Sequence, residues 1–189
     1  MTQLTIDQRF YDLSRQEAIV NIEEALVEII TNSVDAYRIG KLSDQGSEYA
    51  GLPIEIELDP STSTVVVRDH AIGMTSEDMQ NRLLKVGGLT AEESSRGLMG
   101  RGAKDISAIA DLTFISVKDN NLSECVIYHT MNCEVIKSNV ELQDFMRDSL
   151  KLPGNGTIVR MKILDYIPFR TEQQLFSSIS KNIFLRKII

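Results

Sequence analysis

The segment from Glu17 to about Tyr37 carries the most constraining pattern in this chain of 189 residues. Its apolar side chains recur at a spacing of 3.6 residues, which predicts a helix. A second apolar line, at Val20, Val27 and Val34, repeats every seven residues on another side of the same helix. Between the two lines runs a polar strip made of Asn21, Glu24, Glu28, Asn32 and Asp35. A helix that is apolar on two sides is mostly buried, so we expect its narrow polar strip to face a ligand.

The rest of the chain alternates strand and helix patterns, which predicts an α+β two-layer sandwich with a mixed, mostly antiparallel sheet. Strands are expected at residues 54–59, 65–69, 112–117, 125–130, 133–136 and 158–163. Further helices are expected at residues 75–86, 104–110, 141–150 and 171–189. Loops are expected at residues 38–52 and at the glycine-rich residues 87–103. Residues 1–16 are expected to form an N-terminal arm, and residues 17–189 one domain that could be a fragment of a longer protein.

Composition argues against several classes of function. The net charge of −7 gives no broad attraction to nucleic acid or to acidic membranes, so a bound polyanion needs local donors. Two cysteines, Cys125 and Cys133, and two histidines, His70 and His129, are too few for a disulfide scaffold or a cysteine-based zinc site. We find no signal peptide and no apolar stretch near the ~18 residues that span a bilayer. A cytoplasmic protein is therefore expected, with no membrane partner.

Three polar residues of the expected helix share one face, because Glu28, Asn32 and Asp35 stand at positions i, i+4 and i+7. The side-chain oxygen of Asn32 is a hard ligand that suits Mg²⁺. Glu28, one turn away, is placed to take a proton from a water molecule. Acid and amide side chains on a helix more often form a solvated face, so this cluster by itself does not identify a site.

Asp69 ends an expected strand and begins the segment Asp69–Met74. An aspartate at a strand end is most often a turn residue. Its functional interpretation is an acceptor for the exocyclic amine of adenine, with Gly73 letting the backbone approach the ring. Gly156 and Thr157, which begin the last expected strand, are by themselves only a strand start.

Residues 97–104 combine glycines with two cations ahead of an expected helix. Closely spaced glycines let backbone amides turn toward phosphate oxygens, and a helix N-terminus adds partial positive charge. Arg101 and Lys104 add local positive charge to an acidic protein. The spacing fits neither GxxxxGK[ST] nor a GxGxxG that closely follows a strand. A flexible surface loop is the alternative interpretation.

Taken in this order, the four clusters resemble the ATP site of the GHKL superfamily, which includes the ATPase chain of DNA gyrase, the large heat-shock chaperone, histidine kinases, MutL and MORC proteins. Residues 26–36 are similar to its ExxxNxxDA motif. Residues 69–74 are similar to its DxGxGM motif, with Ala71 where a glycine is usual. Residues 97–102 resemble the GxxGxG of the ATP lid, and Thr157 resembles the threonine of the last motif. The lid run of residues 100–105 is closer to MORC-like or little-studied bacterial members than to gyrase.

The resemblance implies the Bergerat fold, in which ATP lies between helices and a flexible lid. It implies that Asp69 accepts a hydrogen bond from the adenine amine, beside Gly73 and Met74. It also implies that Thr157 helps to hold Asp69 and the base through water. The nucleotide-binding contribution of the lid is expected from Gly97, Gly100, Arg101, Gly102 and Lys104.

For catalysis, the resemblance implies that Glu28 activates water, that Asn32 binds Mg²⁺ and that Asp35 orients the site through water. Histidine kinases generally carry asparagine where Glu28 stands, so Glu28 favours a hydrolase. The leading hypothesis is slow ATP hydrolysis coupled to lid closure and homodimerisation. A nucleotide-dependent switch without turnover and a protein kinase of the histidine-kinase type stay open. The sequence does not tell which process is served, or whether DNA or another protein is a partner.

Overall fold

The computed structural model describes residues 19–42, 52–84, 102–130 and 132–181. Six strands form one open sheet in the order β1-β2-β6-β3-β4-β5, and each described pairing is antiparallel. The strands are β1 (Glu55–Asp59), β2 (Thr64–Asp69), β3 (Ala110–Lys118), β4 (Asn121–Ile127), β5 (Cys133–Glu141) and β6 (Gly156–Ile163). The predicted α+β two-layer sandwich is confirmed. The predicted arm of residues 1–16 and the lid up to residue 101 lie outside the described residues.

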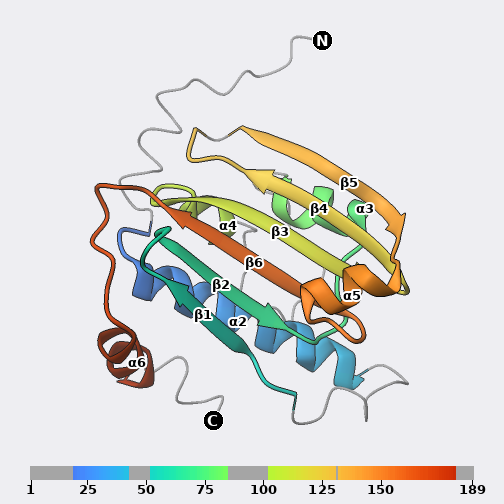
Figure 1. The fold of residues 1–189 in the computed structure, drawn as a ribbon, viewed down its shortest axis with the longest axis horizontal. Coiled ribbons are helices and arrows are strands. Elements are labelled where there is room, and N and C mark those ends of the chain that lie inside the picture. The colour runs from blue at the N-terminus through green and yellow to red at the C-terminus, as the bar shows by residue number, and fades with distance from the viewer. Residues whose placement is uncertain (1–18, 43–51, 85–101, 131, 182–189) are drawn as a thin grey trace, which may run out of the picture.

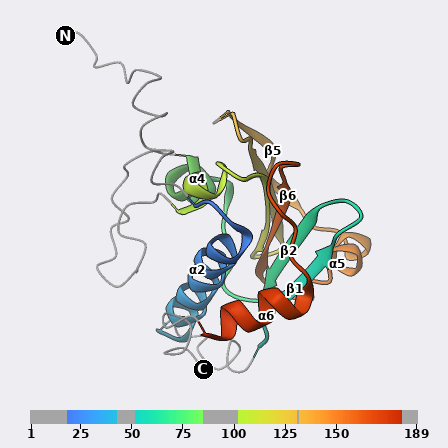
Figure 2. The same cartoon turned by 90° about the vertical axis from the view of Figure 1, so that its left-hand side faces the viewer.

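The main helical layer covers one face of this sheet and one short helix lies on the other face, as Figures 1 and 2 show. The long helix α2 (Ile22–Leu42) and the short α4 (Gly102–Ile106) lie on one face, and α5 (Asp144–Leu150) lies on the other. The helix α6 (Glu172–Lys181) contacts α2. A short α3 (Ser76–Met79) contacts β4 and β5 and continues into a π-helical segment, η1 (Gln80–Leu84). No helix in these ranges is long and apolar enough to cross a membrane.

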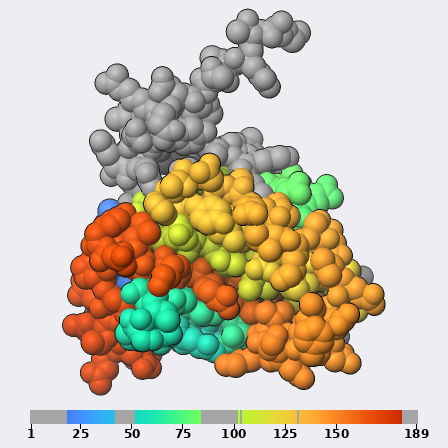
Figure 3. All heavy atoms as spheres, turned by 45° about the horizontal axis from the view of Figure 1, so that its top comes forward, coloured from blue at the N-terminus to red at the C-terminus, as the bar shows by residue number. Residues whose placement is uncertain are grey.

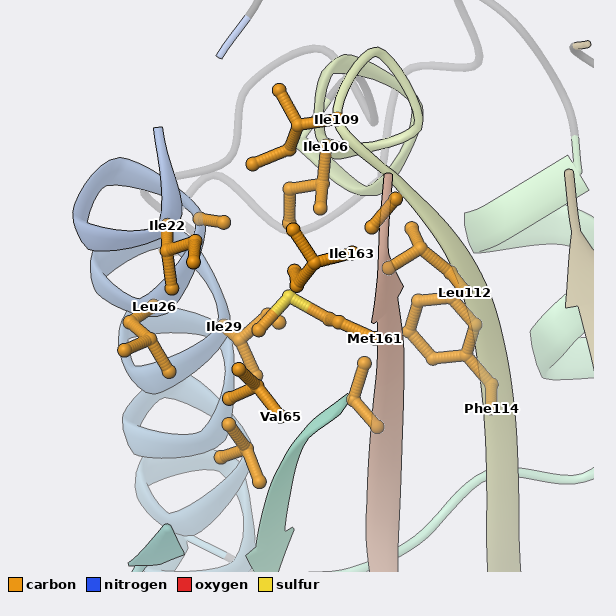
Figure 4. Close-up of a cluster of buried hydrophobic side chains, with 14 of the residues drawn as sticks. Ile22, Leu26, Ile29, Val65, Ile106, Ile109, Leu112, Phe114, Met161 and Ile163 are labelled. Carbon is orange, nitrogen blue, oxygen red and sulfur yellow. The ribbon is translucent and has the colours of Figure 1, made fainter. Parts of the chain in front are cut away.

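The main core lies between α2, α4 and the sheet, because alternate residues of the central strands point toward these helices. Val65 of β2, Met161 of β6 and Leu112 of β3 are paired neighbours in this layer. They pack with Leu26 of α2 and Ile106 of α4 (Figure 4). All five are almost fully buried. This core holds the sheet-facing side of α2 in place, which positions the polar residues of that helix.

The bounds of α2 differ from the predicted helix at both ends. The helix begins at Ile22 rather than Glu17 because Asn21 caps it, its Oδ1 accepting from the Glu24 N–H at 2.8 Å. The helix runs to Leu42 through the buried Gly40, so the prediction of a loop from residue 38 was wrong. One glycine destabilises a helix by only about 1 kcal/mol relative to alanine, which is too little to end a helix that is packed.

The second apolar line of this helix is not buried as predicted. Val20 precedes the helix and is 64% exposed, while Val27 and Val34 are only partly buried. The buried side is the line that includes Ile22, Leu26 and Ile29. The apolar burial of α2 is therefore concentrated on one side, and the contacts of its polar residues have to be described one by one.

Other predicted helices and strands are present in the structure, but they begin or end at different residues. The helix expected at residues 104–110 is α4, which starts at Gly102 and ends at Ile106, because Ala110 already begins β3. The second and third strands of the meander begin or end several residues away from the expected limits, and β5 reaches Glu141, the residue at which a helix was expected. Two local predictions are confirmed: Thr75 and Asp78 form a capping box, and residues 119–120 form the turn between β3 and β4.

Candidate functional site

Asp69 is the centre of a buried hydrogen-bond cluster at the end of β2. Its carboxylate is 5% exposed, although an ionisable side chain is rarely buried without partners. Oδ2 accepts from the Ser33 hydroxyl of α2 at 2.8 Å. Oδ1 accepts from the backbone N–H groups of Ala71 at 3.1 Å and Thr157 at 3.2 Å. A carboxylate offers about four acceptor positions, so these three donors leave room for one more.

The electrostatics of Asp69 are set by burial. Removal from water raises the pKa of this carboxyl above its ordinary value, while the hydrogen bonds from Ser33, Ala71 and Thr157 oppose that rise. A buried carboxylate that keeps an unused acceptor position binds an N–H donor strongly, because such a bond is charge-assisted and shielded from water.

The loop after Asp69 lies directly on β3. Gly73 has a φ of +66°, and a Cβ at this position would lie 2.0 Å from the Val117 carbonyl oxygen. No other residue fits there without moving the strand. The next residue, Met74, donates its backbone N–H to Ser116 Oγ of β3 at 2.7 Å. The loop path is therefore fixed at two successive residues.

Ala71, which stands where the related motif has a glycine, is accommodated by apolar packing. It is fully buried and clusters with Tyr37 of α2. The Tyr37 hydroxyl donates to the Pro53 carbonyl at 3.0 Å and accepts from the His70 N–H at 2.8 Å. The methyl group of Ala71 thus fills space beside a tyrosine that ties α2 to this loop.

Thr157 lies opposite Asp69 in the register of β2 and β6. Its hydroxyl is 2.9 Å from Ser116 Oγ, and Ser116 is completely buried. The preceding residue, Gly156, passes so close to β2 that a Cβ would lie 2.3 Å from the Asp69 carbonyl oxygen. Asp69, Ser116 and Thr157 therefore bring three strand ends together at one point.

Glu28 and Asn32 lie one helical turn apart on α2 and contact each other, and Asn32 directly precedes Ser33. The Asn32 amide donates to Glu28 Oε1 at 3.3 Å, and Asn32 is exposed while Glu28 is half-buried. Burial raises the pKa of Glu28, the hydrogen bond from Asn32 lowers it, and the charges of Asp105 and Asp35 raise it further. Glu28 is therefore a more basic carboxylate than an exposed glutamate, which suits proton abstraction.

The start of α4 lies against Glu28. A Cβ on Gly102 would stand 1.8 Å from Glu28 Oε1, so the glycine is in direct contact with the carboxylate. Lys104, two residues on, is 8% exposed, and burial lowers the pKa of its ammonium group. Asp35 is also buried and lies 3.6 Å from the Arg38 guanidinium. Of the predicted lid residues, Gly97, Gly100 and Arg101 lie outside the described part of the chain.

On the opposite face of the sheet, Arg68 forms a separate ionic network. Its guanidinium is 2.6 Å from Glu55 and 3.1 Å from Glu57, and its Nε donates to the Leu150 carbonyl at 3.0 Å. Lys151 also reaches Glu57, at 3.0 Å. The surface of β1 and β2 accordingly adjoins α5 in the space-filling view (Figure 3). This network joins α5 to the edge of the sheet, and its Glu55 Oε1 also lies 3.6 Å from Nε2 of His70 in the Asp69 loop.

Three residues of the cluster were not predicted from the sequence: Ser33, Tyr37 and Ser116. Ser33 falls on the apolar stripe that repeats every 3.6 residues along the predicted helix, and Tyr37 stands at the end of that helix. The contacts of Ser33 with Asp69, of Tyr37 with His70 and of Ser116 with Met74 cross 33 to 42 residues of sequence. A serine within a buried stripe was the one available signal, because a buried hydroxyl needs a partner. Within the described ranges, no group of three or more His, Cys, Asp or Glu residues is placed to hold a metal ion.

Comparison with known proteins identifies a family for most of these elements. Residues 20–151 match the family model described as histidine kinase-, DNA gyrase B-, and HSP90-like ATPase. The match spans more than half of the chain and includes α2, the Asp69 loop and α4. The comparison with curated proteins gave no match.

Proposed function

We propose that this chain, which belongs to the family of histidine kinase-, DNA gyrase B- and HSP90-like ATPases, binds ATP with Mg²⁺ at the Asp69 cluster and hydrolyses it slowly. The observation that carries the proposal is the Asp69 carboxylate, buried and held by three donors, with an acceptor position left over. In the proposed complex this position accepts from the exocyclic amine of adenine. Gly73 and Met74 border the base, and Thr157 supports Asp69.

The triphosphate is proposed to extend from the base along α2 toward Glu28. Gly102 and Lys104 at the start of α4 are close enough to this helix to take part, together with the lid residues Gly97, Gly100 and Arg101. The exposed amide oxygen of Asn32 fits a hard cation such as Mg²⁺. Bound Mg²⁺ would neutralise phosphate charge, and water and phosphate oxygens complete its shell in such sites. Asp35 is proposed to orient water beside Asn32.

Glu28 is proposed as the general base. It lies one turn from Asn32, which places it near the phosphates and away from the adenine end of the site. Its raised pKa makes its carboxylate a better proton acceptor than an exposed glutamate. Hydrolysis then requires that Glu28 be ionised and that a water molecule stand between it and the terminal phosphate. A positioned base contributes about 10²- to 10⁴-fold to the rate.

Two alternatives differ in the fate of the bound nucleotide. In one, the domain is a switch that binds ATP without turnover. In the other, the phosphoryl group passes to a protein, as in histidine kinases. The carboxylate of Glu28, which lies beside Gly102, favours hydrolysis over both alternatives, since a carboxylate at this position serves to activate water. Lid closure, homodimerisation and a cytoplasmic location belong to the same proposal.

The test compares wild type with Glu28→Gln, which keeps the size of the side chain and removes its basicity. Calorimetry should show ADP and ATP binding with Mg²⁺ in both proteins. A phosphate-release assay should show turnover only in wild type, with a loss of at least about 100-fold in the variant. Equal turnover in the two proteins would remove Glu28 as the base. Labelled protein after incubation with γ-labelled ATP would favour the kinase alternative.

A further inference from the structure

We infer that Ser116 sets the hydrogen-bond polarity of Thr157 and thereby makes the base pocket select adenine over guanine, an inference that rests on the proposed function. Ser116 lies on β3 and is completely buried. It is a positioning residue, because it acts on a bound base through Thr157 and Met74.

Ser116 has more hydrogen-bond partners than its hydroxyl has hydrogens to donate. A serine hydroxyl has one hydrogen to donate and two lone pairs to accept. Ser116 Oγ has three partners: the Met74 N–H at 2.7 Å, the Gly156 carbonyl at 2.9 Å and the Thr157 hydroxyl at 2.9 Å. The Met74 N–H can only donate, and the Gly156 carbonyl can only accept.

These restrictions determine the direction of the third bond. Ser116 accepts from Met74 and uses its only hydrogen for Gly156. All three contacts are therefore hydrogen bonds only if Thr157 donates to Ser116. The hydrogen of the Thr157 hydroxyl is then directed at β3, and this oxygen offers only lone pairs to a ligand.

The Asp69 carboxylate of β2 and the Thr157 hydroxyl oxygen of β6 therefore both offer hydrogen-bond acceptors to the base. Asp69 Oδ1 already holds Thr157 through its backbone N–H at 3.2 Å, and the Asp69 carboxylate is an acceptor when ionised. Adenine carries an amine donor at the position where guanine carries a carbonyl acceptor. In direct contact with the base, two acceptors therefore favour the adenine amine and disfavour the guanine oxygen.

Met74 connects the same hydroxyl to the loop geometry. Gly73 packs against the Val117 carbonyl oxygen. The next residue, Met74, donates its backbone N–H to the hydroxyl of Ser116, which directly precedes Val117. Removing the Ser116 hydroxyl leaves the Met74 N–H without this partner and frees the Thr157 hydrogen to turn toward the ligand. Loss of the Ser116 hydroxyl should therefore reduce both the affinity for the nucleotide and the selectivity for adenine.

Ser123 provides a matched control. It pairs with Ser116 across β3 and β4, is equally buried, and uses its hydroxyl for Asn139 at 3.0 Å. Ser123→Ala therefore removes a comparable buried hydrogen bond without touching Met74 or Thr157. A purely structural role for Ser116 predicts the same behaviour in both alanine variants.

The experiment measures ADP and GDP affinity by calorimetry with Mg²⁺, and the melting temperature, for the whole chain in four forms: wild type, Ser116→Ala, Ser116→Thr and Ser123→Ala. We expect Ser116→Ala to lose about tenfold in ADP affinity and a similar factor in the ADP-to-GDP ratio. Ser116→Thr, which keeps the hydroxyl, should retain the wild-type ratio, and so should Ser123→Ala.

An unchanged ADP-to-GDP ratio in Ser116→Ala, or an equal fall in Ser123→Ala, would overturn the inference while leaving ATP binding intact. Absence of ADP binding by folded wild type would overturn the proposed function, and this inference with it. If Ser116→Ala does not fold, Thr157→Val tests the same polarity by removing the acceptor. Its ADP-to-GDP ratio should fall, and an unchanged ratio would overturn the inference.

Discussion

Gly102 touches the carboxylate of Glu28 so closely that a Cβ at residue 102 would lie 1.8 Å from Glu28 Oε1. The contact joins the first residue of α4 to the second turn of α2. It means that the position of the proposed general base depends on the absence of a side chain 74 positions later in the chain.

Gly102→Ala should therefore reduce hydrolysis while the protein stays folded. The clash involves the end of a flexible side chain, so the Glu28 carboxylate moves and the backbone need not. Alanine also favours a helix over glycine by about 1 kcal/mol, so the melting temperature should not fall. We expect phosphate release to drop by about 10- to 100-fold.

Gly154→Ala is the control, because a Cβ there would meet nothing within 4 Å. It should hydrolyse ATP at the wild-type rate. Wild-type turnover in Gly102→Ala would show that the Glu28 position in this structure is not the one that supports catalysis.

Asn32→Ala should shift the pH dependence of hydrolysis. The proposed mechanism needs ionised Glu28, so the rate should fall as pH drops through the pKa of this carboxyl. Burial raises that pKa above its ordinary value of 4.5, and the Asn32 hydrogen bond lowers it. Without Asn32 the pKa rises further, and the acid limb should move to higher pH.

The measurement is the turnover number at saturating Mg-ATP across about pH 4.5 to 8, where changes in affinity do not contribute. Saturation separates the pH effect from the weaker Mg²⁺ binding that is also expected of this variant. An acid limb at the wild-type position, or at lower pH, would contradict the assignment of Glu28 as the base.

Asp69→Asn should weaken ADP binding by about 10- to 100-fold, since a hydrogen bond to a charged group contributes about 1.5–3 kcal/mol. An amide can still accept from Ala71 and Thr157 through its oxygen, so the fold should survive. Calorimetry measures the affinity. Unchanged affinity would remove Asp69 from the base pocket.

The same variant should change the pH dependence of stability. Burial raises the pKa of Asp69 in the folded protein. Protonation of Asp69 therefore stabilises the folded protein below the ordinary pKa of 3.8, and this stabilisation is lost as pH rises through the raised pKa. Asparagine does not titrate. The stability of wild type relative to Asp69→Asn, from urea unfolding without nucleotide, should therefore decrease as the pH is raised from about 4 to 7. A difference independent of pH would contradict the raised pKa.

The elements that sequence predicts best are those with short-range causes. Thr75 and Asp78 cap α3 as expected because the two halves of the capping box are three residues apart. The turn of Asp119 and Asn120 was visible because residues of this type tolerate positive φ, which is 50° and 64° here. The start of α2 was mispredicted although Asn21 has the capping oxygen, because the apolar spacing continued before it.

The sequence by itself determined the class of fold and the resemblance of the Glu28, Asp69 and Thr157 motifs, because spacing along helices and strands is a local property. Only the tertiary structure decided what these residues touch. Ser33 reaches Asp69, Ser116 joins Met74 to Thr157, and Gly102 meets Glu28 because the order of the strands brings distant segments together. Burial, which raises the pKa of Asp69 and Glu28, also arises only when those segments pack and exclude water.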